Sequence, residues 1–284
     1  MRQSATISPI AATVPKPFVK WVGGKTQLLP ELVKRVPGDI NRYYEPFVGG
    51  GALFFRLQPH RACLTDSNPA LVNLYTVIRD KVDELVKDLD KHIYDEKYFY
   101  KIRSVDRTAE YEHWTDVQRA SRFIYLNKTC YNGLYRVNSK GQFNAPFGRY
   151  TNPTILDSEN LYACHAVLKK TVVEVSDFYN IRRRVRPNDF VYFDPPYAPL
   201  SATAKFTSYT QNGFDVDTQY RLRDLCRALD KRSIRFMLSN SSASLILDLY
   251  AEFNIELVYA TRSINSNVRK RGKVPEVIVT NYEH

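Results

Sequence analysis

The feature that most constrains the fold is a strand, a glycine turn and a helix that follow one another around residue 50. Residues 43–45 (YYE) are typical of a short strand, 46–51 (PFVGGG) of a turn and 52–57 of a helix. This order opens a doubly wound α/β fold, so we predict a mostly parallel sheet. The turn lacks the third glycine of a dinucleotide fingerprint and has no Gly-Lys-Ser/Thr ending. NAD and nucleotide triphosphates are therefore not favoured as ligands.

Later strands extend this pattern around one large insertion. A second strand is expected at 62–65, ending in Asp66, and others are expected at 171–175, 190–193, 234–238, 255–260 and 277–280. Apolar residues at helical spacing predict a helix at 217–231. More than a hundred residues separate Asp66 from the strand near Val172, whereas a parallel crossover needs only a few dozen. We therefore predict an inserted domain between them.

The insertion has helical patterns at 72–89 and 117–126, followed by a hairpin pattern at 131–150. The hairpin tip is predicted at 138–141 (NSKG), where glycine tolerates a positive φ. We expect a mobile arm at 1–17, a main α/β domain formed by 18–75 and 165–284, and an insert at 76–164.

The charge balance points to a polyanionic partner. The chain has 41 Lys and Arg against 30 Asp and Glu, a net charge of +11. Between Arg119 and Tyr150 lie six basic residues, no acidic residue and seven Phe or Tyr. A solvated face explains a charge run equally well, but interleaved rings favour nucleic acid because bases stack on them. Residues 263–275 are a second basic stretch, predicted as a mobile loop near DNA or, almost as readily, a solvated loop without a role.

Other classes of protein are not favoured by the sequence. No segment reaches the roughly 18 uninterrupted apolar residues of a membrane helix, and the start of the chain lacks the apolar run of a secretory signal. The four cysteines are widely spaced without a Cys-x-x-Cys pair, so we predict neither a metal site nor a disulfide framework. A reducing cytoplasm is the expected compartment.

Asp194-Pro195-Pro196-Tyr197 closes the strand predicted at 190–193. Because proline has no N–H and a fixed φ, the chain must leave the sheet here with its carbonyls pointing outward. A planar amino group could donate one hydrogen to Asp194 and the other to the Pro195 carbonyl, with Tyr197 against the ring that bears it. A strand followed by an ordinary turn explains these four residues about equally well.

Acidic residues follow several predicted strands. Parallel sheets bind ligands at the carboxyl ends of their strands, so Glu45, Asp66, Asp177 and Asp194 are expected to line one edge. Asp66 could accept hydrogen bonds from a nucleoside cofactor, or it could be the N-cap of a helix starting near Pro69.

Residues 20–25 (KWVGGK) place a tryptophan between two lysines. Lys25 could pair with a cofactor carboxylate and Lys20 with nucleic acid. Alternatively, Trp21 is a core anchor and both lysines are solvated.

Five motifs together resemble one protein family. They are residues 18–25 (FVKWVGGK), 45–51 (EPFVGGG), 132–136 (NGLYR), 143–150 (FNAPFGRY) and 194–201 (DPPYAPLS). In this order they are similar to the Dam-type DNA adenine-N6 methyltransferases that act within GATC, and the resemblance covers nearly the whole chain from Pro17. It implies a Rossmann-like methyltransferase domain with an inserted target-recognition domain, and S-adenosylmethionine as cofactor. It also implies double-stranded DNA as substrate and a place at the nucleoid.

The resemblance assigns a catalytic and a cofactor site. The target base would be held for methylation by Asp194, Pro195, Pro196 and Tyr197 after leaving the duplex. The cofactor would be bound by Trp21, Lys25, Phe47, Gly49, Gly51, Asp66, Asp177, Phe178 and Asp194.

The resemblance also assigns DNA contacts. These would come from Lys20, Tyr131, Asn132, Leu134, Arg136, Pro146, Arg149 and Tyr150. Lys20 and Arg136 would read the outer guanines of the two half-sites. Leu134 and Pro146 would touch the thymine, and Tyr131 and Asn132 would intrude beside the displaced adenine.

The sequence departs from the family pattern in the arm at 1–17, at Gly50, where relatives also carry alanine, and at Tyr135, where some carry cysteine. The arm leaves a targeting or regulatory role open. We expect a monomer, and the sequence does not distinguish a solitary enzyme of DNA replication and repair from the partner of a restriction endonuclease.

The sequence leaves three alternative functions open. An RNA or cytosine-N4 methyltransferase could use the same four residues, although the match at 131–150 argues against it. A glutamine methyltransferase would more typically carry Asn in place of Asp194. A catalytically silent DNA-binding protein on the same scaffold is the alternative outside enzymes.

Overall fold

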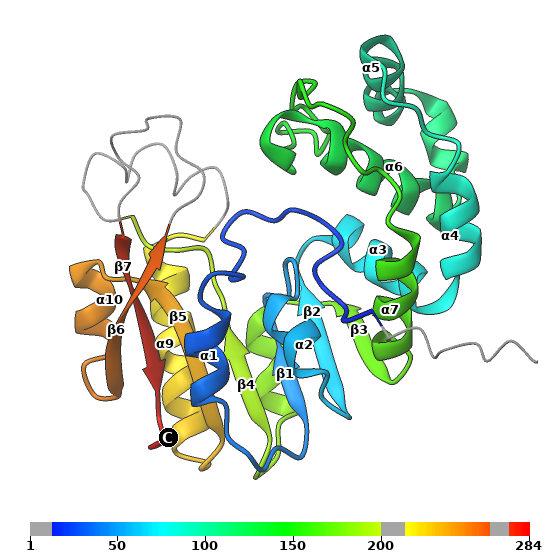
Figure 1. Ribbon diagram of the computed structural model, residues 1–284. Coiled ribbons are helices and arrows are strands. Elements are labelled where there is room, and N and C mark those ends of the chain that lie inside the picture. Colours follow the sequence, from blue (N-terminus) through cyan, green and yellow to red (C-terminus); the bar gives the residue numbers. More distant parts are fainter. Residues whose placement is uncertain (1–12, 200–213, 262–272) are drawn as a thin grey trace, which may run out of the picture.

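A seven-stranded sheet forms the base of the molecule (Figure 1). The computed structural model describes residues 13–199, 214–261 and 273–284. The strands are β1 Tyr43–Glu45, β2 Ala62–Asp66, β3 Thr171–Val175, β4 Phe190–Phe193, β5 Arg235–Ser241, β6 Asn254–Thr261 and β7 Lys273–Thr280, in the spatial order β3-β2-β1-β4-β5-β7-β6. The first five run parallel and β7 is antiparallel to both its neighbours. The predicted mostly parallel α/β sheet is confirmed.

The strand order reverses at β1, which pairs with β2 on one side and with β4 on the other. In open α/β sheets such a reversal leaves a crevice at the carboxyl ends of the two central strands, and ligands bind there. Glu45 ends β1 and Asp194 directly follows β4, so both lie at the carboxyl ends of these two strands.

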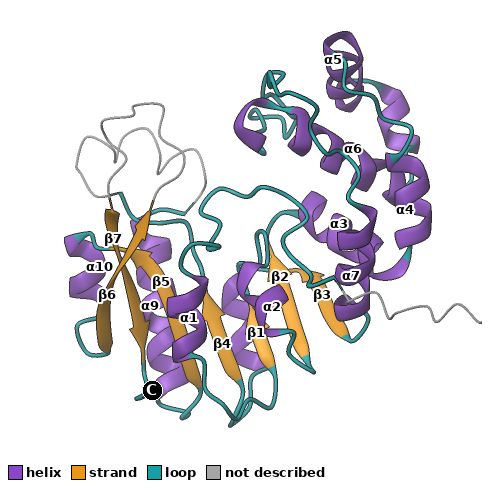
Figure 2. Ribbon diagram, viewed as in Figure 1, coloured by secondary structure: helices purple, strands orange, loops and turns teal. Residues whose placement is uncertain are grey.

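Helices cover both faces of the sheet (Figure 2). One face is covered by α1 Leu29–Arg35, α2 Ala52–Leu57, α3 Pro69–Asp80 and α7 Ser158–Leu168, and the other by η4 Phe178–Arg183, α9 Val216–Asp230 and α10 Ser244–Leu249. Tyr43 and Tyr44 of β1 are 0% and 2% exposed and belong to the two opposite apolar cores. Burial on both faces is typical of a parallel sheet.

The insertion is a helical arm that rises above α3 and α7 in Figure 1. It contains α4 Val82–Leu89, α5 Glu96–Ser104, η1 Val105–Arg107, η2 Ala109–His113, α6 Asp116–Thr129 and η3 Tyr131–Gly133. Leu85, Phe99 and Tyr125 of this arm are fully buried and share one core with Leu53 of the main domain. The arm is therefore packed against the main domain through a continuous apolar core.

The predicted hairpin at 131–150, here called the recognition loop, is paired only at isolated bridges. Val137 bridges Phe143 and Cys130 bridges Phe147, without a ladder. The tip closes where the Asn138 N–H donates to the Gln142 carbonyl at 2.8 Å. Regular strands do not form here, and both backbone polar groups of Phe143 bond to side chains of η1, those of Asp106 and Arg107.

Several element boundaries differ from the sequence prediction. β7 begins at Lys273 and not at 277, and β6 and α6 each extend beyond their predicted bounds at both ends. β5 continues beyond Leu238 to Ser241, because three polar residues pair with β7. The sequence pattern did not predict this end of the strand, because Ser and Asn are not apolar although they are buried here. The helical region predicted at 72–89 is two helices, α3 and α4, broken at Lys81 with φ −140°.

Among the helices of the described ranges, none is both long enough and apolar enough to cross a membrane. In the same ranges, no three His, Cys, Asp or Glu side chains are grouped to hold a metal ion.

Candidate functional site

Asp194 follows β4 at the reversal of strand order. Its Oδ1 accepts a hydrogen bond from Ser239 Oγ at 3.0 Å and pairs with Lys25 Nζ at 2.6 Å. The Tyr192 hydroxyl lies 3.0 Å from the same Ser239 oxygen. No donor in the described residues reaches Asp194 Oδ2. One carboxylate oxygen is thus fixed from behind and the other keeps its capacity to accept.

Burial raises the pKa of Asp194 above its ordinary value, and Lys25 and Ser239 oppose that rise. In this ion pair the Asp194 side chain is 19% exposed and the Lys25 side chain is 6% exposed. Lys25 Nζ also lies 4.4 Å from the centre of the Tyr197 ring, a cation–π distance. The ammonium therefore contacts both the Asp194 carboxylate and the Tyr197 ring. The sequence analysis did not foresee this ion pair of Lys25 with Asp194, and the contact of Lys25 with a cofactor carboxylate stays a prediction.

The segment 194–198, here called the catalytic loop, is held by side chains from three neighbouring elements. Gln219 Nε2 on α9 donates to the Pro196 carbonyl at 3.2 Å. The Tyr197 hydroxyl donates to Glu276 Oε2 on β7 at 2.6 Å.

Two further contacts come from β5, where Asn240 Oδ1 accepts from Ala198 N–H at 3.1 Å and Ser241 Oγ donates to the Ala198 carbonyl. Within the described residues no donor reaches the Pro195 carbonyl, so this carbonyl and Asp194 Oδ2 are two acceptors of the loop that have no hydrogen-bond partner there.

The four acids predicted at the sheet edge have different environments. Glu45 is buried and accepts a hydrogen bond from the Tyr43 hydroxyl at 2.9 Å, and burial raises its pKa well above the ordinary value. Asp177 is more exposed, accepts from Tyr179 N–H at 2.8 Å and pairs with Arg221. Glu45 is thus an internal group, whereas Asp177 remains accessible.

Asp66 contacts the glycine turn. Its two oxygens accept from Gly49 N–H at 3.2 Å and Asn68 N–H at 2.9 Å, and burial raises its pKa. Asn68, not Asp66, is the N-cap of α3, with its side chain bonded to two backbone N–H groups. The N-cap alternative for Asp66 was therefore wrong.

Two glycines of the turn have left-handed backbone conformations, Gly49 with φ +47° and Gly51 with φ +66°. A Cβ at Gly49 would lie 2.6 Å from the Trp21 ring, and one at Gly51 would lie 2.6 Å from the Tyr75 hydroxyl. The turn therefore requires glycine at both positions.

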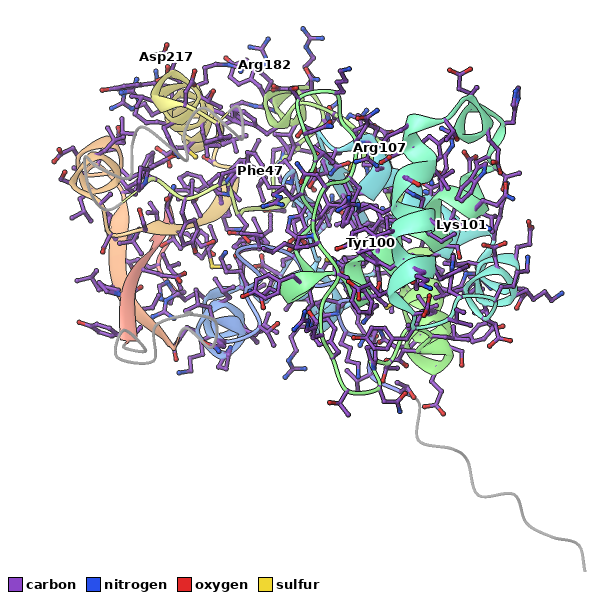
Figure 3. All side chains as sticks on the ribbon, turned by 90° about the horizontal axis from the view of Figure 1, so that it is seen from above. Phe47, Tyr100, Lys101, Arg107, Arg182 and Asp217 are labelled. Atoms are coloured by element: carbon purple, nitrogen blue, oxygen red, sulfur yellow. The ribbon has the colours of Figure 1, made fainter. Side chains whose placement is uncertain are left out.

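Aromatic side chains surround this end of the sheet. Trp21 stacks on Tyr135, with centroids 5.7 Å apart, and is partly buried against the core, so it does anchor the segment to the insert. Phe47 stacks on Phe178 at 5.2 Å. Seen from above, Phe47 lies near the middle of the molecule, with the insert residues Tyr100 and Lys101 to one side (Figure 3).

The predicted DNA contacts gather on the recognition loop and the N-terminal segment beside it. The Lys20 backbone is fixed by Asn127, whose side chain accepts from Lys20 N–H at 2.8 Å and donates to its carbonyl at 2.9 Å. Lys20 Nζ lies 4.9 Å from the Tyr150 ring centre. Lys20 is thus held by α6 and contacts the recognition loop.

A cavity of about 280 Å³ lies beside this point. It is lined by Tyr131, Asn132, Phe147, Gly148, Arg149 and Tyr150. Asn132 has φ +57°, a conformation that Asn tolerates better than most residues. Four of the predicted DNA contacts therefore share one concave surface.

Leu134 is half-buried and Pro146 is exposed on the recognition loop. Arg136 is exposed and donates from Nε to Asn144 Oδ1 at 2.7 Å. Three predicted parts lie outside the described residues. These are Leu200 and Ser201, most of the basic loop predicted at 263–275, and most of the arm at 1–17.

The structure adds four polar residues that the sequence analysis missed, Ser239, Asn240, Gln219 and Glu276. Three of them lie on β5 and β7. The run Ser239-Asn240-Ser241 directly after an apolar strand was an available signal, because polar residues there meet the carboxyl edge of the sheet.

The mostly parallel sheet, glycine turn and acidic strand ends define the class of Rossmann-like methyltransferases. The chain matches the family described as D12 class N6 adenine-specific DNA methyltransferase over residues 21–264. It belongs to that family, and it is an adenine-specific DNA methyltransferase.

Curated relatives cover almost the same length. The chain is 44% identical to the Type II methyltransferase M1.LlaDCHI of Lactococcus lactis subsp. cremoris, over 94% of this chain and 95% of the relative. It is 43% identical to the Type II methyltransferase M.MjaIII of Methanocaldococcus jannaschii, over 94% and 99%. It is 35% identical to the DNA adenine methylase of Escherichia coli strain K12, over 92% and 93%.

Proposed function

We propose that the enzyme transfers a methyl group from S-adenosylmethionine to N6 of adenine in double-stranded GATC sites, on a base turned out of the duplex. The observation that carries this proposal is the pair of acceptors that the segment 194–197 leaves without a hydrogen-bond partner in the described residues, Asp194 Oδ2 and the Pro195 carbonyl. Two fixed acceptors match the two hydrogens of an amino group and stabilise the positive charge that grows on nitrogen. Stacked adenine cannot reach such acceptors, so the base has to leave the duplex.

The residues around the glycine turn fit the cofactor. Asp66 offers carboxylate oxygens at the end of β2, Asp177 offers an accessible carboxylate, and Phe47 and Phe178 form an aromatic wall. When bound there, S-adenosylmethionine supplies a methyl group activated by its sulfonium.

Lys25 pairs with Oδ1 of Asp194 and also donates to the Gly23 carbonyl, so Oδ2 can accept the amino group while this ion pair stays in place. A contact between Lys25 and the carboxylate of the cofactor remains part of the proposal and would require the ammonium to leave Asp194. The proton that N6 loses after methylation passes to Asp194 directly or through water.

Sequence discrimination is assigned to the recognition loop. Arg136 offers a fork of donors that matches O6 and N7 of guanine, and Lys20 can meet the same acceptors. We therefore propose 76–164 as the target-recognition domain, with 18–75 and 165–284 as the catalytic domain, in an enzyme of the cytoplasm that works at the nucleoid. The intact Asp194, Tyr197 and glycine turn argue against a catalytically silent protein, and the adenine-specific family argues against cytosine, RNA and glutamine as targets.

One assay tests the proposal. The protein is incubated with labelled S-adenosylmethionine and matched duplexes that contain or lack GATC, and the nucleosides are then analysed. The expected product is N6-methyladenine in the GATC duplex alone. Label in a different nucleoside would refute the target atom, and equal label in both duplexes would refute the site.

A further inference from the structure

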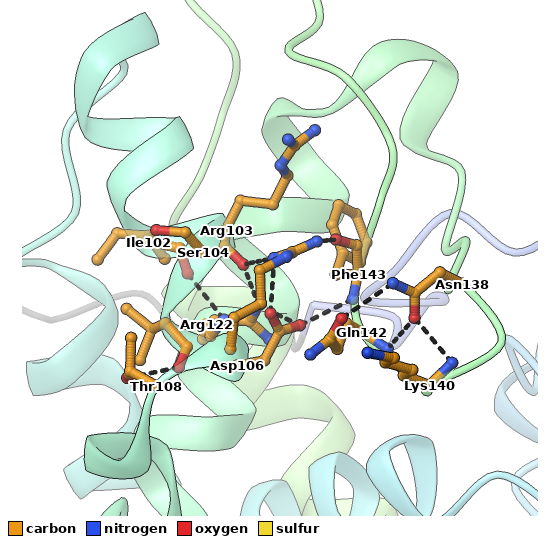
Figure 4. Close-up of polar contacts among 12 residues, drawn as sticks. Ile102, Arg103, Ser104, Asp106, Thr108, Arg122, Asn138, Lys140, Gln142 and Phe143 are labelled. Atoms are coloured by element: carbon orange, nitrogen blue, oxygen red, sulfur yellow. Dashed lines mark hydrogen bonds and ion pairs between the residues drawn. The ribbon is translucent and has the colours of Figure 1, made fainter.

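Beyond its tip, the recognition loop is attached to the helical insert through Phe143. Phe143 N–H donates to Asp106 Oδ2 on η1 at 2.7 Å (Figure 4). Arg107 Nη2 donates to the Phe143 carbonyl at 2.8 Å. Both backbone polar groups of this residue therefore bond to side chains of η1. In a regular hairpin these two backbone groups would bond to the neighbouring strand, and here the side chains of Asp106 and Arg107 take that place.

Asp106 is itself firmly positioned. Its Oδ2 lies 2.8 Å from Arg122 Nη2 on α6, and both side chains are 8% exposed. Its Oδ1 lies 2.7 Å from Arg107 Nη1. Arg122 also donates from Nε to the Ile102 carbonyl on α5 at 2.9 Å. A carboxylate this poorly hydrated depends on its charged partners, so its position is coupled to α5 and α6.

Phe143 directly precedes Asn144, which holds Arg136. Asn144 accepts from Arg136 Nε at its side-chain oxygen at 2.7 Å and from Nη2 at its carbonyl at 3.0 Å. It also donates its N–H to the Arg136 carbonyl at 2.9 Å. These contacts use one side edge of the guanidinium. The end edge, with hydrogens of Nη1 and Nη2, stays available for a two-pronged contact with a guanine.

We propose that Asp106 is a positioning residue for sequence discrimination. It fixes Phe143, and through Phe143 it fixes Asn144, so that the Arg136 fork is presented in one orientation. Hydrogen bonds weaken steeply as their angles depart from linear, so a shift of the fork reduces its ability to distinguish guanine from other bases. This inference rests on the proposed reading of one outer guanine by Arg136.

The experiment compares kcat/KM on the GATC duplex with kcat/KM on duplexes substituted at each outer guanine in turn. Arg136→Ala is the reference and should lose about 5- to 150-fold of discrimination at one guanine. Asp106→Asn should lose about 3- to 30-fold at the same guanine and none at the other. Because both act through one contact, the double variant should be no worse than Arg136→Ala alone.

Two further variants keep the inference falsifiable. Arg107→Gln leaves the Asp106–Arg122 pair in place but removes the bond to the Phe143 carbonyl, so it should reproduce the loss even if Asp106→Asn folds poorly. Asp95→Ala is the matched control, because Asp95 caps α5 by accepting from Tyr98 N–H at 2.7 Å and is not bonded to the recognition loop. It should destabilise the same insert and keep full discrimination.

The outcomes separate the two levels of the argument. If Arg136→Ala discriminates as the wild type does, the proposed guanine contact is wrong. If Arg136→Ala loses discrimination but Asp106→Asn and Arg107→Gln do not, only the positioning role is overturned. It is also overturned if Asp95→Ala shows the same loss, or if the loss from Asp106→Asn is spread equally over both guanines.

Discussion

The catalytic loop and the recognition loop are both irregular segments, but they are held in different ways. The catalytic loop follows strand β4, and its contacts Ser239 and Glu276 belong to the next strand β5 and to β7 beside it. The recognition loop has two isolated bridges and is attached through side chains such as Asp106 and Asn144.

This difference matches the division between chemistry and specificity that we propose for the two loops. Strands β4, β5 and β7 are buried in the apolar cores, so the acceptors of the catalytic loop cannot shift without disturbing the packed core. The recognition loop can change its contacts while the sheet stays intact. Substitutions in the first region should therefore affect the rate on every substrate, and those in the second should affect the choice of substrate.

The largest effect is expected from Asp194→Ala. The variant lacks an acceptor fixed at the point where positive charge develops, so single-turnover methyl transfer should fall about 10²- to 10³-fold or more. DNA binding, followed by fluorescence anisotropy, should survive in part because the recognition loop is unchanged. Near-native turnover by this variant would overturn the catalytic assignment.

A substitution on the recognition side should act differently. Lys20→Ala removes the proposed contact with the other outer guanine and should lower discrimination there by about 1–3 kcal/mol. The rate on GATC under saturating DNA should change little, because Lys20 does not touch the catalytic loop. Parallel measurements on duplexes substituted at each guanine check this, and a uniform loss on all of them would indicate a phosphate contact instead.

Ser239→Ala should have a smaller effect, about tenfold on the transfer rate, because it removes one hydrogen bond to a carboxylate. Asp194 acts in its ionised form, and Ser239 lowers its pKa against the rise caused by burial. Without this donor the pKa rises further, so activity should be lost at a higher pH as the solution is acidified. Single-turnover rates between about pH 5 and 9 test the shift. If the loss of rate at low pH occurs at the same pH in the variant and the wild type, a group other than Asp194 controls it.

The smallest effect is expected from Glu45→Gln. Burial raises the pKa of Glu45 well above its ordinary value, so its contribution to stability is present below the unfolded pKa and is lost as pH rises through the folded value. Glutamine keeps an acceptor for the Tyr43 hydroxyl without a charge. Thermal unfolding at about pH 8 should therefore move up by a few degrees, and the difference should vanish near pH 4. A folded variant that no longer transfers methyl groups would instead place Glu45 in the chemistry.

The sequence predicted β1, β3 and β4 at their observed bounds, together with the insertion between β2 and β3, because apolar runs and glycine turns are local signals. It also predicted that Asp66 and Asp194 lie at the carboxyl edge of the sheet. It did not predict that Glu45 is internal, that Asn68 caps α3 or that Lys25 pairs with Asp194, since each depends on which side chains meet after folding.

The sequence alone determined the α/β pattern and the amino-acid types that an amino-group methyltransferase needs, because periodicity and turn chemistry act over a few residues. Only the tertiary structure decided which oxygen of Asp194 remains available and how the recognition loop is held. Those contacts join β4 to β5 and Phe143 to Asp106, 37 residues apart in the chain, and the choice among such distant partners is made by packing of the whole core.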